Sequence, residues 1–204
     1  MAEKFLKDTY GQSDPEGTMR HYDKWAATYD AEIAENGYAT PGRCAAALAR
    51  HLDDHDAPLL DFGCGTGLSG VALGLQGFQV IDGLDPSAEM LAHAKDRDVY
   101  RRLTHIPPGA DVPGKQGDYA AITAIGVIGV GAAPPTVMQQ IMTALSPGGL
   151  FVFSLNDHAL ADPDCCLARD ALITSGQAEE LEQTYGDHLP GIDLKSTVYV
   201  YVKL

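Results

Sequence analysis

The fold of this chain is decided by one stretch, Leu59-Leu60-Asp61-Phe62-Gly63-Cys64-Gly65-Thr66-Gly67. A short apolar run, typical of a buried strand, leads into three glycines at alternate positions, and the residues that follow fit a helix. Glycines let the chain turn sharply and let a ligand lie against the backbone. The N–H groups at the start of a helix favour negatively charged ligand atoms. The loop therefore suits a pyrophosphate or the carboxylate of an amino acid.

The spacing of the glycines separates these two ligands. A dinucleotide loop reads G-x-G-x-x-G, which from Gly63 requires Gly or Ala at position 68, but that residue is Leu68. Asp61 stands two residues before Gly63, where a carboxylate repels a pyrophosphate and attracts an ammonium group. S-adenosylmethionine carries an α-ammonium group and a sulfonium. The loop therefore favours this cofactor over a nicotinamide dinucleotide.

A second acid follows the loop at a meaningful distance. The sequence Gly83-Leu84-Asp85-Pro86-Ser87 ends the next apolar run. Asp85 lies about 20 residues beyond the loop, where a carboxylate can accept hydrogen bonds from both ribose hydroxyls. Pro86 suits the first turn of a helix, since it has no N–H to leave unpaired. The alternative is that Asp85 only caps that helix.

Outward from this region, short apolar runs alternate with helical patterns, which indicates βαβ units around a mostly parallel sheet. We expect strands at residues 58–62, 78–84, 99–103, 118–125, 150–155, 178–185 and 193–203. We expect helices at residues 19–35, 41–52, 68–76, 86–97, 135–145 and 159–175. No linker divides the chain, so residues 1–204 are expected to form one domain. Within it, residues 1–53 would be an N-terminal helical lid and 54–204 a Rossmann-like core.

These motifs resemble those of class I S-adenosylmethionine-dependent methyltransferases. The resemblance continues at residues 117–119 and 145–150, and residues 22–30 resemble the N-terminal helix of many small-molecule methyltransferases. Residues 126–149 look most like the methyltransferase-like family first named from the Williams–Beuren syndrome region. The resemblance implies an α/β, Rossmann-like methyltransferase fold. Its seven-stranded, mostly parallel sheet would have the order 3-2-1-4-5-7-6, with an antiparallel strand seven and helices on both faces.

The resemblance also implies the cofactor contacts. The glycine loop would surround the methionine part, Asp85 would hold the ribose, Met90 would pack near the adenine, and residues 124–126 would face the cofactor. The predicted cofactor-binding residues are Tyr22, Trp25, Tyr29, Asp61, Gly63, Cys64, Gly65, Gly67, Asp85, Pro86, Met90, His105, Ile106 and Ala124. Tyr22, Trp25 and Tyr29 would close over the site as a lid. Their alternative role is a helix stripe packed on the core.

One departure from the family concerns the adenine. Many relatives place an Asp after strand three, whereas residues 103–107 hold no carboxylate here. His105, backbone groups, or Asp111 from the following loop are the candidates to replace it.

The expected reaction is methyl transfer to a small-molecule acceptor by in-line displacement, with S-adenosyl-L-homocysteine as product. Because the cofactor carries a good leaving group, a base is needed only if the acceptor must lose a proton. The weak candidates for a catalytic base are His21, His105 and His158, each of which is also readable as a surface histidine. No Asn-Pro-Pro-Tyr-like element follows residue 124, and the apolar loop 126–133 suggests a small or partly apolar acceptor.

The composition of the chain limits the kinds of partner that we expect it to bind. Lys plus Arg is 14 and Asp plus Glu is 28, so the formal net charge is −14, which argues against a nucleic-acid substrate.

The most apolar stretch, residues 119–133, is too short to span a bilayer, so we expect no membrane segment. The four cysteines form no C-x-x-C pair, which disfavours structural zinc and suggests a reduced, cytoplasmic protein. We expect no metal, and a monomer or homodimer. Two alternatives remain: a non-catalytic cofactor-binding subunit, and a nicotinamide-dependent oxidoreductase.

Overall fold

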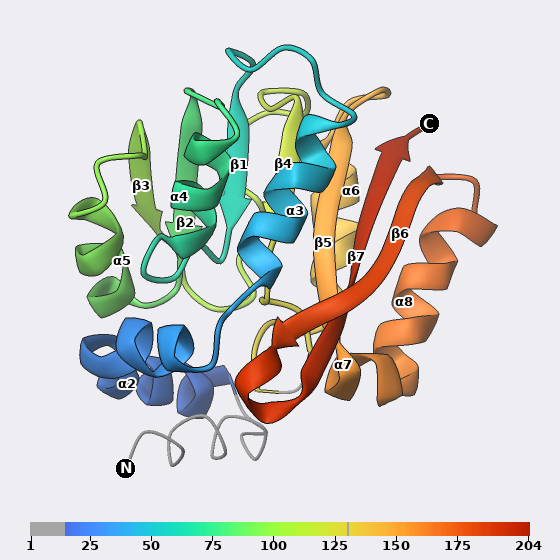
Figure 1. The fold of residues 1–204 in the computed structure, drawn as a ribbon. Coiled ribbons are helices and arrows are strands. Elements are labelled where there is room, and N and C mark those ends of the chain that lie inside the picture. The colour runs from blue at the N-terminus through green and yellow to red at the C-terminus, as the bar shows by residue number, and fades with distance from the viewer. Residues whose placement is uncertain (1–14, 130) are drawn as a thin grey trace.

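One seven-stranded sheet organises the computed structural model, which describes residues 15–129 and 131–204 (Figure 1). Its strand order is β3-β2-β1-β4-β5-β7-β6. The strands are β1 (Leu59–Phe62), β2 (Ile81–Asp85), β3 (Arg102–His105), β4 (Ala121–Ala124), β5 (Leu150–Asn156), β6 (Ala178–Leu189) and β7 (Leu194–Lys203). The pairs among β1 to β5 are parallel, while β7 runs antiparallel to both β5 and β6. The predicted fold class and strand order are confirmed.

Helices cover both faces of this sheet. They are α2 (Pro15–Glu35), α3 (Thr40–Ala49), α4 (Leu68–Leu75), α5 (Ala88–Lys95), α6 (Val137–Ala144), α7 (Asp157–Ala161) and α8 (Pro163–Thr174), with the short 3-10 helix η1 (Pro190–Ile192). In Figure 1, α3 and α4 lie in front of the sheet and α6 lies behind it. The sequence analysis grouped α3 with the lid, but α3 packs against β5 and β7 as part of the front layer.

Each face of the sheet buries its own apolar cluster. In β1, Leu59 belongs to the cluster under α3 and α4, and its neighbour Leu60 belongs to the cluster under α6 and α8. Successive side chains of a strand point to opposite faces, so a strand covered on both sides must be apolar throughout. This explains why all residues of β1 except Asp61 are apolar.

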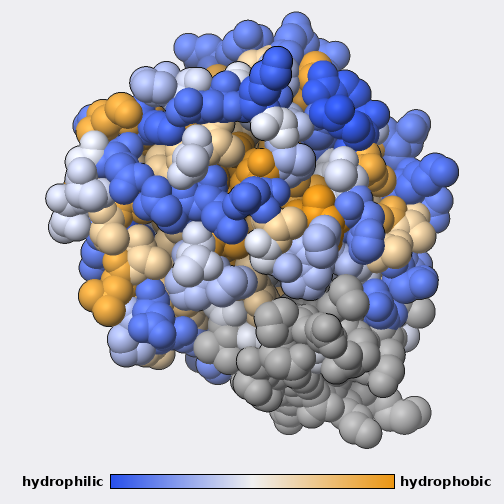
Figure 2. Space-filling view, turned by 180° about the vertical axis from the view of Figure 1, so that it is seen from behind, coloured by the Kyte–Doolittle hydropathy of each residue, from blue (hydrophilic) through white to orange (hydrophobic). Residues whose placement is uncertain are grey.

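The surface contrasts with these clusters. Figure 2 shows the side opposite to that of Figure 1, where hydrophilic residues dominate and hydrophobic residues form small, partly recessed patches. In the described parts of the chain, no helix combines the length and apolar character needed to cross a membrane.

Several element boundaries differ from those expected: the strands predicted at 78–84 and 118–125 begin at Ile81 and Ala121, and the helix predicted at 159–175 is divided at Asp162 into α7 and α8. The third strand begins at Arg102 rather than near residue 99, because Tyr100 turns inward under the glycine loop and Asp98 adopts a left-handed backbone conformation (φ 54°). Strand β6 continues to Leu189, four residues further than expected. β6 is joined to β7 through η1. The hairpin tip, formed by the end of β6, η1 and the start of β7, reaches the N-terminal helix α2.

The hairpin tip and α2 share a third apolar cluster. Trp25 and Ile33 of α2 pack there with Leu189 and Leu194 from the two ends of the hairpin tip. Figure 1 shows α2 at the lower edge of the sheet, toward which β1 and β2 point. The carboxyl ends of the parallel strands are therefore covered by two segments from opposite ends of the sequence.

Candidate functional site

The glycine loop between β1 and α4 is fixed to the neighbouring strand. The N–H groups of Gly63 and Cys64 donate to the carbonyl oxygen of Leu84 at 2.8 and 3.0 Å. Gly65 has φ +52°, and a Cβ placed on it would meet no atom within 4 Å. The backbone at this position therefore borders open space, as a ligand lying against the loop requires.

Asp85 stands at the end of β2, facing that loop. Its carboxylate accepts hydrogen bonds from the N–H groups of Gly65 and Ser87, both at 2.9 Å. Burial raises the pKa of Asp85 to about 6; these two N–H groups lower it, and the nearby charges of Asp61 and Asp23 raise it further. The helix that follows is capped by the Ser87 hydroxyl, which accepts from the N–H of Met90 at 3.1 Å. Asp85 is therefore not the side chain that caps α5.

Asp61 has a different environment from the one that the ammonium hypothesis suggests. It is fully buried beneath the loop, where it accepts hydrogen bonds from the hydroxyls of Ser69 (2.5 Å), Tyr100 (2.8 Å) and Thr123 (2.9 Å). Burial raises the pKa of Asp61 in spite of these three bonds. Asp61 is not among the residues that line the cavity. It supports the loop from below, and its contact with a cofactor stays a prediction.

Two carboxylates of helix α2 accept hydrogen bonds from the segments that follow β1 and β2. Asp23 accepts a hydrogen bond from the Ser87 hydroxyl at 2.5 Å. Asp30 accepts one from the Thr66 hydroxyl at 2.6 Å and pairs with the guanidinium of Arg97. The helix is thus anchored to the residues that follow β1 and to those that follow β2.

The aromatic residues of α2 divide between the two roles considered for them. Tyr29 lines the cavity. Trp25 is 1% exposed and lies behind Tyr29, with ring centroids 4.7 Å apart in an edge-to-face arrangement. Its indole N–H donates to Glu32 at 2.9 Å. The side chains of Tyr22 and His21 fall outside the described residues.

A cavity of about 230 Å³ lies between α2, the glycine loop and the ends of β1 to β4. It is lined by Tyr29, Tyr38, Pro41, Phe62, Gly63, Cys64, Gly65, Thr66, Leu68, Ser69, Leu84, Asp85, Pro86, Met90, Ile106, Pro107, Pro108, Gly109, Ala110, Ile125, Gly126, Val127, Ala132, Ala133, Pro134 and Val137. Most of these are apolar. Among the described lining residues, Asp85 is the one carboxylate, and none is a lysine, arginine or histidine. The cavity therefore has an apolar interior with a single acid at its wall.

Sequence reasoning identified part of this lining. The predicted residues that line the cavity are Tyr29, Gly63, Cys64, Gly65, Asp85, Pro86, Met90 and Ile106. Those that do not line it are Trp25, Asp61, Gly67, His105 and Ala124. Burial raises the pKa of the Cys64 thiol well above its ordinary value, so this residue contributes a neutral wall.

Neither of the two candidate bases whose side chains are described, His105 and His158, lines the cavity. His105 uses Nε2 in a 2.9 Å hydrogen bond with the carbonyl oxygen of Pro86, and His158 is exposed at the start of α7. Asp111 is also exposed, and accepts a long 3.5 Å contact from Gln140. None of the three lines the cavity. The lining beyond β3 consists of Ile106 and the backbone-rich residues 107–110.

Tyr38 and Pro41 are lining residues that the sequence analysis missed. They lie between α2 and α3, in a segment with no fixed spacing to the glycine loop. The signal that existed is the sequence Gly37-Tyr38-Ala39-Thr40-Pro41, a helix start with an aromatic residue beside it. That signal predicts a helix boundary, but it does not predict that the aromatic ring reaches a cavity formed by other strands.

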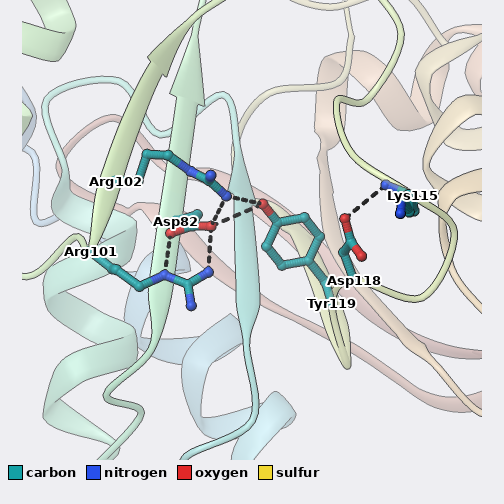
Figure 3. Close-up of polar contacts among 6 residues, drawn as sticks. All are labelled: Asp82, Arg101, Arg102, Lys115, Asp118 and Tyr119. Atoms are coloured by element: carbon teal, nitrogen blue, oxygen red, sulfur yellow. Dashed lines mark hydrogen bonds and ion pairs between the residues drawn. The ribbon is translucent and has the colours of Figure 1, made fainter.

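A second buried carboxylate, Asp82, lies on the same strand as Asp85 (Figure 3). It accepts hydrogen bonds from Arg101 (2.9 and 2.7 Å), Arg102 (2.7 Å) and the Tyr119 hydroxyl (3.0 Å). Burial alone would raise the pKa of Asp82, but the bonds from the two arginines and the tyrosine outweigh it and hold the pKa below its ordinary value. This carboxylate is fully paired within the protein.

The described residues hold no group of three or more His, Cys, Asp or Glu side chains arranged to bind a metal ion. All four cysteines are free thiols. The cytoplasmic location stays a prediction.

The sheet order, the glycine loop and the acid at the end of β2 define a class of protein, the Rossmann-like methyltransferases. Comparison with protein families makes the assignment specific: the methyltransferase domain family matches residues 36–196. The chain belongs to this family, and its fold is that of the class I S-adenosylmethionine-dependent methyltransferases.

Individual relatives agree with this assignment. Human methyltransferase-like protein 27 is 30% identical over 148 residues, which are 71% of this chain but only 60% of that protein. The protein solved with the Haloferax volcanii Trm112 methyltransferase activator has a TM-score of 0.70 at 19% identity, covering 91% of this chain and 97% of that one. An S-adenosylmethionine-dependent methyltransferase from Thermotoga maritima has a TM-score of 0.65 at 14% identity, covering 92% and 100%. At these identities the two structures show the fold. The narrower resemblance to the Williams–Beuren family stays a prediction.

Proposed function

We propose that this protein binds S-adenosylmethionine in the cavity and transfers its methyl group to a small-molecule acceptor. The observation that carries the proposal is the pairing of Gly65 with Asp85: a loop that borders open space, held by a carboxylate at the cavity wall. Family membership and the named activity of the Thermotoga relative support the same reading.

The residues around the cavity fit the cofactor part by part. Asp85 is in place to accept hydrogen bonds from ribose hydroxyls, and an ionised carboxylate makes such bonds strong. Met90 and Ile106 offer apolar surfaces to the adenine. The backbone of Gly63 and Gly65 leaves room for the methionine part. A nicotinamide dinucleotide fits less well, because Leu68 replaces the third glycine that a pyrophosphate loop requires.

The chemistry follows from positioning. When bound, S-adenosylmethionine would supply an electrophilic methyl group: the methyl–sulfur bond would break as the acceptor's nucleophilic atom bonds to the methyl, leaving S-adenosylhomocysteine, and any proton on that atom would be lost to solvent once the product has left the cavity. The protein contributes by holding the acceptor in line, which in favourable systems lowers a barrier by roughly 7–11 kcal/mol. The apolar cavity wall excludes water from the reacting atoms.

The first test is calorimetric titration of the protein with S-adenosylhomocysteine, with NADH run alongside. We expect micromolar binding of S-adenosylhomocysteine and no binding of NADH. Binding of NADH alone would overturn the proposal. Transfer of a labelled methyl group from S-adenosylmethionine to a panel of small molecules then tests catalysis. Tight cofactor binding without any turnover would favour a non-catalytic subunit, and the Haloferax complex makes a partner protein the next candidate to add.

A further inference from the structure

The half of the cavity nearest β4 is built differently from the half that carries the glycine loop. If the proposed function holds, a cofactor anchored at Asp85 on β2 extends its amino-acid part over β1. The acceptor must then approach from the next strand in the sheet, β4. The cavity residues that follow β4 are Ile125, Gly126 and Val127, and Tyr38 lies over Gly126; Tyr29 lines the same cavity from α2.

Tyr29 is held rigidly at this wall. The ring of Trp25 packs edge-to-face behind it, and the indole N–H of Trp25 is fixed by Glu32 at 2.9 Å. Glu32 is itself 6% exposed and also accepts from the Thr28 hydroxyl at 2.8 Å. A buried, hydrogen-bonded ring thus braces the tyrosine from behind.

Tyr38 is braced in the same way by the hairpin tip. The ring of His188 packs edge-to-face against it, with centroids 5.2 Å apart. His188 is 6% exposed, and its Nδ1 is 2.8 Å from the hydroxyl of Thr40, which is 3.0 Å from the hydroxyl of Ser196. The N–H of Ala39 also donates to the carbonyl oxygen of His188 at 3.0 Å. Both tyrosines therefore have fixed orientations, so little side-chain freedom is lost when a ligand packs on them.

The hydroxyl of Tyr38 lies directly over the end of β4. A Cβ placed on Gly126 would be 2.2 Å from that oxygen, and Gly126 has φ +69°. Its N–H donates to the Ser154 hydroxyl at 2.9 Å, which fixes this turn. Glycine at this position lets the tyrosine oxygen come within reach of the space above β4.

Among the described residues near this wall, the charged side chains are bonded to other protein groups: Glu32 accepts hydrogen bonds from Trp25 and Thr28. Burial, with the nearby Arg43 charge second, lowers the pKa of His188 to about 4, so this ring is uncharged at neutral pH. The guanidinium of Arg43 donates to the carbonyl oxygens of Thr184, Asp187 and Ser196. The carboxylate of Asp85 belongs to the cofactor half.

We propose that Tyr29 and Tyr38 form the acceptor-binding wall, and that the acceptor is an uncharged molecule with a flat, apolar body whose polar group contacts the Tyr38 hydroxyl. This inference rests on the proposed function, because it places the cofactor in the other half of the cavity. A charged acceptor would lose its hydration in this apolar space, and no described lining residue on the acceptor side carries a charge that would replace it.

The test uses three probes of similar size: phenol, benzoate and benzylamine, which at neutral pH are neutral, anionic and cationic. Protein saturated with S-adenosylhomocysteine is titrated with each probe, and binding is followed by saturation-transfer NMR. We expect phenol to bind at least about tenfold more tightly than either charged probe. We expect Tyr38→Ala to weaken phenol binding by about tenfold as well, through the lost aromatic contact.

Controls separate this inference from the proposal beneath it. Tyr185→Ala removes an exposed tyrosine of β6 that does not line the cavity, and should leave phenol binding unchanged. If Tyr38→Ala fails to fold, Tyr29→Ala provides the same measurement. Equal binding of the three probes, or unchanged phenol binding in both wall variants, would overturn the inference. Failure of S-adenosylhomocysteine to bind the unmodified protein would instead reject the proposed function.

Discussion

Two carboxylates on strand β2, Asp82 and Asp85, are both buried yet have opposite surroundings. Asp82 is 2% exposed and accepts from two arginines and a tyrosine. Asp85 is 7% exposed and accepts from two backbone N–H groups, and no cation among the described side chains is bonded to it. The pKa of Asp82 is accordingly held below its ordinary value, and the pKa of Asp85 is raised to about 6.

The difference distinguishes a structural acid from a candidate ligand-binding acid. A buried carboxylate whose partners all come from the protein contributes to the fold, and removing it leaves those partners unpaired. A buried carboxylate that lacks a cation and faces a cavity is a candidate for function, because its charge is only partly compensated. The following predictions test this contrast, beginning with the largest expected effect.

Gly65→Val fills the space that Asp85 faces while leaving both carboxylates in place. A Cβ at position 65 meets no protein atom within 4 Å, so the valine extends into the open cavity, and φ +52° strains its backbone. We expect S-adenosylhomocysteine affinity to fall more than about 100-fold, at least ~2.7 kcal/mol. Calorimetry measures this, and an affinity close to that of the unmodified protein would reject the loop assignment.

Asp85→Ala removes the uncompensated acid. Losing hydrogen bonds to a charged group costs about 2 kcal/mol, so the S-adenosylhomocysteine affinity should fall about 30-fold. The same titration serves as the measurement, with circular dichroism to verify the fold. Unchanged affinity would mean that Asp85 only supports the loop.

Asp82→Asn is the matched change at the structural acid. Arg101 and Arg102 would lose their counter-charge, and we expect the free energy of unfolding to drop by about 1–2 kcal/mol. Urea denaturation measures the drop. Affinity for S-adenosylhomocysteine should stay within about twofold, since this effect is confined to the opposite end of β2. A large loss of S-adenosylhomocysteine affinity in Asp82→Asn would show that the two acids do not have separate roles.

Lowering the pH should act on one acid only. With its pKa near 6, Asp85 becomes protonated between pH 7 and pH 5, so cofactor affinity should decrease by up to about tenfold at pH 5. Asp82 has a lowered pKa, so its contribution to stability is lost only below the ordinary Asp value of about 4, outside this window. Calorimetry at pH 5, 6 and 7 tests this, and Asp85→Ala should show no such pH dependence.

Arg102→Gln gives the smallest effect. The side chain of Arg102 is 63% exposed, so its ion pair with Asp82 is screened by solvent and contributes little to stability. Asp82 keeps Arg101 and Tyr119. Urea denaturation of this variant should fall between the unmodified protein and Asp82→Asn; a loss as large as that of Asp82→Asn would show that Arg102 is the main partner.

The resemblance to the methyltransferases predicted the sheet order, and local spacing predicted part of the cavity lining. Gly63, Gly65 and Asp85 are fixed by local spacing, because the turn after a strand places its residues at the carboxyl edge. The environment of Asp61 was not predictable in this way. Its three hydroxyl partners come from α4, β4 and the loop before β3, and no local pattern joins Ser69, Tyr100 and Thr123.

The same limit applies to the wall formed by Tyr29 and Tyr38. The helical spacing of Trp25 and Tyr29 left two roles open, and packing assigned one residue to each. His188 carries no motif, and its position against Tyr38 depends on how far β6 extends before it turns. Such contacts follow from tertiary packing, which periodicity does not encode.

The length of chain between the partners of this wall also has a consequence for synthesis on the ribosome. Thr40 bonds to His188 and Ser196, 148 and 156 residues further along the sequence. The glycine loop and Asp85 are complete roughly 110 residues before Ser196, a delay of roughly 6 to 22 s at ordinary translation rates. A growing chain therefore contains its cofactor motifs well before the hairpin that braces Tyr38. If this wall selects the acceptor, as proposed, that selectivity can form only after the hairpin has been synthesised.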